Sequence, residues 1–322
     1  MVLSVAVCAP FCPRGYANDY LNAVHRATGN QRRRARVDTR RFVLMDNMRS
    51  VCHHALVGSM RIVVINLKRA GERRERMARE FAAVSLPYEI KEAIDGRLLS
   101  DDQLSQVDWE GRRRLGLYPP ADGGIANWLT QREAMQDLVE SGPDMMAVFE
   151  DDVRLEPDLP VVLAALEGRT FDFGVVALQR RHPRRRFLPC IALTERHTAG
   201  RVRYSDSGSD GYVITRTAAR HLLDTTPKMV LSTDHAVLRY WANGLNVFYV
   251  DPPVVHHGGY ENTFIGTDRT VSRRLRTESD YTVGFWRRAV TGVSRSVQKH
   301  IAFRRLVNED RRNAALPLAK RA

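Results

Sequence analysis

Residues 145–152 read Met-Met-Ala-Val-Phe-Glu-Asp-Asp, an apolar run that ends in three carboxylates. A short, continuous apolar run of this kind predicts a strand that is buried on both faces. Glu150, Asp151 and Asp152 follow it directly, at the edge of an open α/β sheet where ligands bind. The stretch therefore predicts a central strand and a site at its carboxyl end.

Strand and helix patterns alternate on both sides of this run. The repeated alternation predicts an α/β fold, with a Rossmann-type, mostly parallel sheet and helices on both faces. Residues 180–210 are expected to form an irregular loop that could cover the acceptor side. We expect strands at 62–67, 88–93, 145–149, 174–178, 211–215 and 246–250, and helices at 71–84, 125–140, 217–223 and 232–243.

The chain of 322 residues carries 50 Lys and Arg against 37 Asp and Glu, a formal net charge of +13. Alone, this surplus suggests nucleic acid or an anionic membrane as a partner. It lies at the two ends, however: residues 1–59 carry a net +6, residues 269–322 a net +10, and residues 60–268 a net −3. A nucleic-acid-binding domain normally carries its basic stripe on the folded module, so we expect no specific nucleic-acid partner.

The same composition changes divide the chain into three parts. We interpret 1–59 as a disordered extension, or as an over-extended start with Met60 as the true beginning. Residues 60–268 are the expected globular domain, and 269–322 a basic, partly helical tail. The tail could form an amphipathic helix on an anionic membrane surface, or remain a solubilising extension.

The acidic cluster has a specific chemical meaning. Adjacent carboxylates repel one another, so their proximity costs stability unless a cation compensates. Oxygen ligands favour hard divalent ions, Mg²⁺ or Mn²⁺. The alternative is a solvated acidic loop after a strand, and the chemistry of Glu150, Asp151 and Asp152 alone leaves both interpretations open.

A second polar group follows the strand expected at 62–67. Asn66 ends an apolar run, and a buried amide needs partners, so it contacts a ligand or bridges the structure. Arg69 and Arg73 come next, where a Rossmann-like sheet contacts a nucleotide, and the guanidinium fork matches phosphate oxygens. Alternatively, the arginines of this segment form the solvent-exposed face of a helix.

Five short motifs occur in order along the middle of the chain. With these motifs the sequence resembles glycosyltransferase family 25, of the lipo-oligosaccharide galactosyltransferase type. The resemblance implies a GT-A fold, a nucleotide-sugar donor and inverting transfer to a glycan hydroxyl. The motifs are 65–69 (Ile-Asn-Leu-Lys-Arg), 93–96 (Ala-Ile-Asp-Gly), 149–153 (Phe-Glu-Asp-Asp-Val), 211–216 (Gly-Tyr-Val-Ile-Thr-Arg) and 234–235 (Asp-His).

The resemblance also implies roles for single residues. Asp95 and Tyr212 join Asn66, Arg69 and Arg73 as donor-binding residues. The three carboxylates would hold Mn²⁺ or Mg²⁺ on the donor diphosphate.

Three further residues have two interpretations each. His257 would add a metal ligand after the last strand, or is a surface histidine. Asp234 would act as the base for the acceptor hydroxyl, or caps a helix. Asp210, in a Gly-rich loop, would bind sugar hydroxyls or form a turn.

One stretch departs from the family pattern. Where the family has Gly-Glu-(Ile/Leu)-Gly-Cys-x-x-Ser-His, residues 123–131 read Gly-Gly-Ile-Ala-Asn-Trp-Leu-Thr-Gln, which bears on donor identity and on activity.

The leading expectation is a metal-dependent, inverting glycosyltransferase that moves a sugar, galactose favoured, from a UDP-sugar to a cell-surface glycan such as lipopolysaccharide. We expect it in the cytoplasm or on the inner face of the cytoplasmic membrane, with a glycan or lipid-linked glycan as acceptor. The alternatives are a catalytically weakened homologue that acts as an assembly partner, and a basic nucleic-acid-binding protein.

Overall fold

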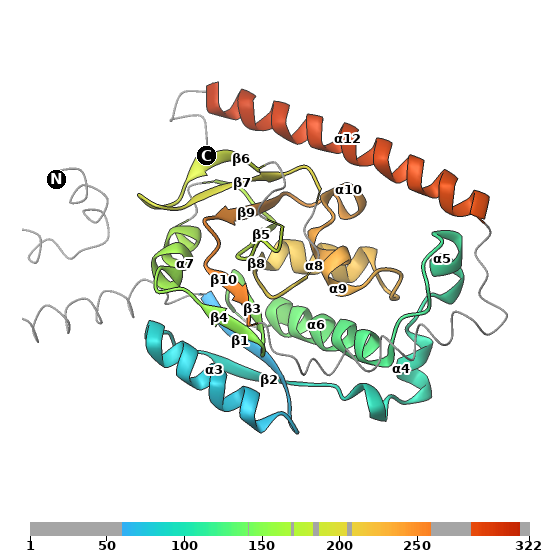
Figure 1. Cartoon of the computed structure of the whole chain (residues 1–322), viewed down its shortest axis with the longest axis horizontal. Helices are drawn as coiled ribbons and strands as arrows, with labels where there is room; N and C mark the ends of the chain where they lie inside the picture. The colour runs from blue at the N-terminus through green and yellow to red at the C-terminus, as the bar shows by residue number, and fades with distance from the viewer. Residues whose placement is uncertain are drawn as a thin grey trace, which may run out of the picture. The chain divides into compact units, whose positions relative to one another are not determined.

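The computed structural model describes residues 60–140, 142–168, 171–182, 187–204, 208–258 and 285–315. Both interpretations of residues 1–59 therefore concern residues outside this set, as does the boundary expected at residue 268. Within the described set, helices lie on both sides of a central sheet (Figure 1).

The central sheet has eight strands in the order β2-β1-β3-β8-β5-β9-β7-β6. β1 pairs in parallel with β2 and β3, and β5 pairs in parallel with β9. β8 runs antiparallel to β3 and β5, and β7 runs antiparallel to β9 and β6. The strands are β1 (Met60–Leu67), β2 (Glu89–Ala93), β3 (Met145–Glu150), β5 (Val175–Ala177), β6 (Phe187–Ala192), β7 (Thr198–Val202), β8 (Gly211–Thr215) and β9 (Val247–Asp251).

The mostly parallel sheet is confirmed, with β8 and β7 as reversed strands inside it. β4 (Val153–Leu155) and β10 (Val255–His257) pair as a separate two-stranded sheet next to the carboxyl end of β3. This small sheet brings His257 opposite Val153, directly after the acidic cluster.

Strand β3 lies in the middle of the core because both of its faces are apolar. Met145, Ala147 and Phe149 join a cluster on one side of the sheet, whereas Met146 and Val148 join a cluster on the other side. Alternate residues of a strand point to opposite faces, so a strand covered on both sides has a continuous apolar sequence.

Helices α3 (Gly71–Val84) and α7 (Leu159–Glu167) cover the first face. Helices α6 (Asp122–Glu140), α8 (Arg216–Thr225), α9 (Thr233–Leu238) and α10 (Tyr240–Asn243) cover the second. The expected helices on both faces are thus confirmed. Short helices η2 (Gly96–Leu98), α4 (Asp101–Ser105) and α5 (Trp109–Arg114) connect β2 to α6.

Two expectations of local structure were wrong. The helix expected at 232–243 is divided into α9 and α10, because the backbone leaves the helical region at Arg239, with φ −85° and ψ 78°. The side chain of Asn243 donates to the carbonyls of Ala236 and Val237 and satisfies groups that the break exposes.

The second wrong expectation is the irregular loop at 180–210. This segment contains the β6–β7 hairpin at the edge of the sheet. Pro189 interrupts the strand pattern in the sequence, but an edge strand tolerates proline because one row of its amides needs no partner.

The basic tail contains a long helix, α12 (Phe285–Ala315). Its residues Ala302, Phe303 and Leu306 pack against the cluster on the second face of the sheet. Among the described helices, none is both long and apolar enough to cross a membrane.

Candidate active site

The first polar contacts at the sheet edge join β1 to the residues after β3. Ile65 is paired with Glu150, which brings the next residues of both strands together. The Nδ2 of Asn66 donates to Oδ2 of Asp151 at 2.8 Å, and Nη1 of Arg73 donates to Oδ1 of the same carboxylate at 2.7 Å. Both oxygens of Asp151 are therefore engaged by side chains of the first strand and helix.

The carboxylate of Asp152 has fewer close polar partners than that of Asp151. Its Oδ2 lies 3.8 Å from Nη1 of Arg73, and its Oδ1 lies 3.8 Å from Nδ1 of His257. Among the described residues, this buried Oδ1 has no hydrogen-bond partner. Burial raises the pKa of Asp152 above its ordinary value, although His257 and Arg73 oppose the shift. A cation bound here would give the unpartnered oxygen a ligand and would offset the cost of burying the negative charge.

Two more acidic residues complete the cluster. Ser209 donates to Oε1 of Glu150 at 2.7 Å, and burial, with the nearby charges of Asp210 and Asp152, raises the pKa of Glu150 to about 8. The Asp210 side chain is fully buried and is paired with Arg181 through two hydrogen bonds. The cluster therefore contains four carboxyl groups, two guanidinium groups and the imidazole of His257.

Sequence reasoning did not place Asp210 or Arg181 in this cluster. The antiparallel pairing of β3 with β8 sets Phe149 opposite Gly211, so the residue before β8 lies beside the acidic residues after β3. The amide of Glu150 accordingly donates to the carbonyl of Asp210 at 3.0 Å. No signal in the sequence shows that β8 is reversed.

The side chains fit a divalent cation only together with ligand oxygens from outside the chain. Within the described ranges, no three His, Cys, Asp or Glu side chains surround one point closely enough to hold a metal ion. The unpartnered Oδ1 of Asp152 and the imidazole of His257 are the groups with capacity for a cation. Two protein ligands leave the other coordination positions for a substrate, as is usual for Mg²⁺ sites.

A cleft with a volume of about 120 Å³ opens in front of the carboxylates. Arg69 lines it and donates to Oδ2 of Asp95 at 2.7 Å, while Arg97 donates to the same oxygen at 2.9 Å. These two arginines hold the pKa of Asp95 well below its usual range. A Cβ at Gly96 would lie 2.7 Å from the backbone nitrogen of Gly123, so the cleft wall requires glycine there. The cleft is thus acidic at its base and basic at its rim.

Asp234 lies in the first turn of α9 and is hydrogen-bonded to the loop before β8. Its Oδ2 accepts the backbone amide of Gly208 at 3.1 Å. Burial opposes ionisation of this carboxyl, but the charge of His235 and hydrogen bonds from Ser232 and Gly208 outweigh it and lower the pKa of Asp234. Asp234 is not among the residues that line the cleft.

A family model described as "Glycosyltransferase family 25 (LPS biosynthesis protein)" matches residues 60–237, more than half of the chain. The chain belongs to glycosyltransferase family 25. The matched region begins with β1 and ends within α9, so it includes every cluster residue except His257.

Curated relatives agree with this membership. A glycosyltransferase 25 family member of Aedes aegypti is 34% identical over 108 residues, which are 31% of this chain and 17% of the relative. Procollagen galactosyltransferase 1-A of Xenopus laevis is 29% identical over 131 residues, 37% of this chain and 21% of the relative. Procollagen galactosyltransferase 1 of Danio rerio is 27% identical over 190 residues, 55% of this chain and 31% of the relative. The chain thus spans less than a third of the length of each.

The segment that departs from the family 25 pattern supports the cleft from behind. Thr130 accepts the amide of Ile94 at 3.0 Å and donates to the carbonyl of Ala126 at 2.8 Å, which fixes the strand end before Asp95. Asn127 lines the cleft. Gln131 is buried, and its Oε1 accepts from Tyr212, whereas its Nε2 has no hydrogen-bond partner among the described residues.

The structure does not bring Tyr212 into the cleft. The side chain is fully buried behind the sheet, and its hydroxyl donates to Oε1 of Gln131 at 2.6 Å. Burial raises the pKa of Tyr212 above its ordinary value. Tyr212 therefore lies in the core behind the cleft, whereas Arg69, Arg73 and Asp95 line it and Asn66 contacts the carboxylate cluster.

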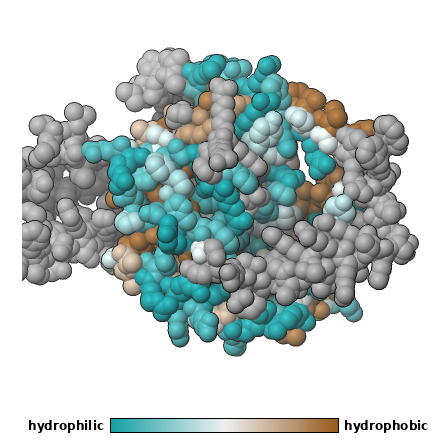
Figure 2. Space-filling view, in the orientation of Figure 1, coloured by the Kyte–Doolittle hydropathy of each residue, from teal (hydrophilic) through white to brown (hydrophobic). Residues whose placement is uncertain are grey.

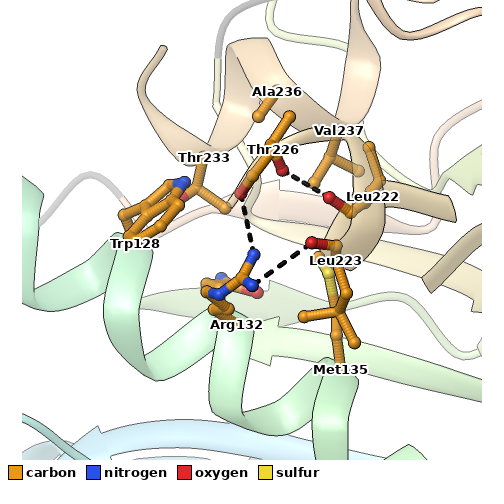
Figure 3. A pocket seen from close by; sticks show the side chains of 10 residues that line it. Trp128, Arg132, Met135, Leu222, Leu223, Thr226, Thr233, Ala236 and Val237 are labelled. Atoms are coloured by element: carbon orange, nitrogen blue, oxygen red, sulfur yellow. Dashed lines mark hydrogen bonds between the residues drawn. The ribbon is translucent and has the colours of Figure 1, made fainter. Parts of the chain in front are cut away.

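A smaller pocket, with a volume of about 20 Å³, is lined by residues of α6, α8 and α9 (Figure 3). Arg132 of α6 reaches across it and donates to the carbonyls of Thr226 and Leu223, at the end of α8. Thr233 and Val237 of α9 line the same pocket. The helix that carries Asp234 is thus held by α6 and α8.

Proposed function

We propose that this chain is a metal-dependent galactosyltransferase that uses UDP-galactose and glycosylates a hydroxyl of a cell-surface glycan such as lipopolysaccharide, with inversion at the anomeric carbon. The proposal rests on Asp152, which lines the cleft together with Arg69 and Arg97 and whose buried Oδ1 has no hydrogen-bond partner among the described residues. Galactose is favoured because relatives are named procollagen galactosyltransferases. The glycan acceptor is suggested by the family model's description.

Asp152 and His257 would hold Mn²⁺ or Mg²⁺. The ion would offset the negative charge that develops on the leaving nucleotide. Asn66 and Arg73 engage both oxygens of Asp151 beside it, so Asp152 is the carboxylate left to bind the cation.

The arginines at the cleft rim would contact the donor. Arg69 is held toward the cleft by Asp95, and its guanidinium suits phosphate oxygens. Arg73 lies between Asp151 and Asp152 and would stay close to a bound diphosphate. In this assignment the pairs with Asp95 and Asp151 orient each guanidinium before the donor arrives.

Asp234 would take the proton from the acceptor hydroxyl. An inverting transfer needs a single base on the acceptor side. The lowered pKa keeps this carboxylate ionised at neutral pH, so it is available as a proton acceptor. Its bond to Gly208 links it to the loop that ends in Asp210, beside the carboxylate cluster.

A donor screen tests the proposal. The purified chain is incubated with UDP-galactose, UDP-glucose and UDP-N-acetyl sugars, with and without Mn²⁺, and UDP release is measured. We expect UDP-galactose to be favoured and Mn²⁺ to be required. Asp152→Asn should lower turnover at least about a hundredfold, because metal-derived charge stabilisation is worth several kcal/mol.

The matched control is Asp102→Asn, an exposed aspartate of α4 outside the cleft, which should leave turnover unchanged. Equal turnover in Asp152→Asn and the wild type would exclude the metal role of Asp152. Binding of Mn²⁺ and UDP without turnover of any donor would instead favour a catalytically weakened homologue.

A further inference from the structure

The helix α12 presents a stripe of aliphatic side chains outward. Val290, Val293, Val297 and Ile301 are 67%, 66%, 52% and 63% exposed. Residues three and four apart lie on the same side of a helix, so these four form one continuous face. Figure 2 shows hydrophobic surface along the N-terminal half of α12. Among the described residues, no other element exposes such a row.

The opposite face of α12 is fixed to the sheet. Arg201 of β7 is almost fully buried and binds both carboxylate oxygens of Asp310 at 2.9 Å. Nζ of Lys299 lies 4.8 Å from the ring centroid of Trp241. Together with the packing of Phe303, these contacts determine which side of the helix faces away from the protein.

The exposed part of α12 is also positively charged. Arg304, Arg305, Arg311 and Arg312 are exposed and follow the aliphatic stripe directly. The acidic residues of the helix are compensated, since Asp310 pairs with Arg201 and Glu309 with Arg305 at 3.1 Å. Arg304, Arg311 and Arg312 pair with no carboxylate among the described residues, and an aliphatic face next to these uncompensated arginines matches the boundary of an anionic bilayer, where apolar area and phosphate attraction add.

We propose that α12 docks this chain on the surface of an anionic lipid bilayer, with the aliphatic stripe among the acyl chains and the arginines on lipid phosphates. Charge favours this occupant over a second copy of the chain. A copy would bring the same uncompensated arginines against one another, whereas a surface of lipid phosphates complements them.

Docking through α12 would also orient the candidate site. Burial lowers the pKa of His235, and the charges of Arg239, Lys299 and Arg295 lower it further. The inner face of α12 is therefore within electrostatic range of α9, which carries Asp234. A lipid-linked acceptor on the same surface would approach this end of the protein. That link rests on the proposed function, whereas the lipid contact itself does not.

Vesicle co-sedimentation of the full chain tests the docking. The vesicles contain phosphatidylglycerol or only phosphatidylcholine, and the salt concentration is varied. The stripe variant is Val293→Ser/Val297→Ser/Ile301→Ser. Its matched control is Leu98→Ser/Val161→Ser, which removes exposed aliphatic side chains elsewhere on the surface. Arg304→Gln/Arg311→Gln tests the charged part.

We expect the wild type and the control to bind phosphatidylglycerol vesicles and not phosphatidylcholine vesicles. The stripe variant and the charge variant should each bind about tenfold more weakly, and salt should weaken binding of the wild type. Wild-type binding that the stripe variant retains would overturn the proposal, as would absence of wild-type binding. A dimer in sedimentation velocity that only the stripe variant loses would assign the face to a second copy and also overturn it. Binding needs no catalysis, so a chain that binds vesicles but turns over no donor would contradict the proposed function alone.

Discussion

Asp152 is buried and Asp234 is partly buried, and the surroundings of these two aspartates differ in kind. Asp152 has an oxygen without a partner and a raised pKa, because burial outweighs His257 and Arg73. Asp234 is held by Gly208, Ser232 and His235, and its pKa is lowered although burial opposes this. The protein stabilises one carboxylate fully and leaves the other incompletely compensated.

The difference indicates that the two carboxylates have different roles. A buried carboxylate without full compensation costs stability, and a cation that binds there recovers this cost. A compensated carboxylate stays ionised without a ligand and can only act as an anchor or as a proton acceptor. The region of Asp152 is therefore suited to bind a charged group, and that of Asp234 to meet a neutral hydroxyl.

Replacing Asp234 should have the largest effect on catalysis. Asp234→Asn keeps an oxygen that can accept the amide of Gly208, so the fold should be retained. Removal of a general base typically costs 10²–10⁴ in rate, and we expect a loss of about that size in kcat for transfer. The measurement is steady-state transfer with the donor and acceptor identified by screening, next to thermal unfolding of both proteins.

The pH dependence sharpens this test. Because the pKa of Asp234 lies below its ordinary value near 4, the base stays ionised as the pH falls, and kcat/KM at saturating Mn²⁺, which holds Asp152 ionised, should show no acid limb above about pH 5. An acid limb near pH 6.5 would assign the base to a histidine, and full activity of Asp234→Asn would leave Asp234 as an anchor of the loop.

Removing Arg181 should have the next largest effect, on stability. Arg181→Met leaves Asp210 buried without its guanidinium partner, beside Glu150 and Asp152. Asp210 is fully buried but Arg181 is partly exposed, so the loss of this pair should cost about 2 kcal/mol, and Mn²⁺ should recover more stability in the variant than in the wild type. Urea unfolding with and without Mn²⁺ measures both quantities.

The control for Arg181 is Arg154→Met. Arg154 pairs with Glu156 at 3.3 Å, but its side chain is 62% exposed, so the change should cost less than about 1 kcal/mol. Equal costs for the two variants would show that the carboxylate cluster is hydrated in solution. The contrast between Asp152 and Asp234 would then lose its physical basis.

The sequence predicts the contacts that depend on parallel strands. The apolar run before Glu150 identifies β3, and the Ile62–Leu67 pattern, observed within β1 (Met60–Leu67), identifies its neighbour. Asn66 is expected to contact a ligand or to bridge the structure, and in the structure it donates to Asp151, 2.8 Å away. The sequence therefore indicates that this amide needs a partner, whereas the pairing of β1 with β3 determines which partner it has.

The remaining contacts depend on the direction of each strand and on the face of the sheet to which each side chain points. Asp210 reaches the cluster because β8 is antiparallel to β3, and the apolar sequence of β8 is compatible with either direction. Tyr212 and Val213 are both apolar enough for the core, so the sequence does not indicate which one faces α6. In the structure Tyr212 faces α6. Its side chain therefore has a supporting role in the core, in place of the expected contact with the donor.

The smallest effect is expected for Tyr212→Phe, which tests that supporting role. The variant removes the hydroxyl that donates to Gln131 and leaves a buried amide oxygen without its partner, at a cost of about 1–2 kcal/mol. The donor KM should not change, because the side chain lies behind the sheet and outside the cleft. The double variant Tyr212→Phe/Gln131→Leu removes both polar partners and should recover part of the lost stability. A tenfold increase in donor KM for Tyr212→Phe, without loss of stability, would place Tyr212 in direct donor binding and extend the site through the sheet.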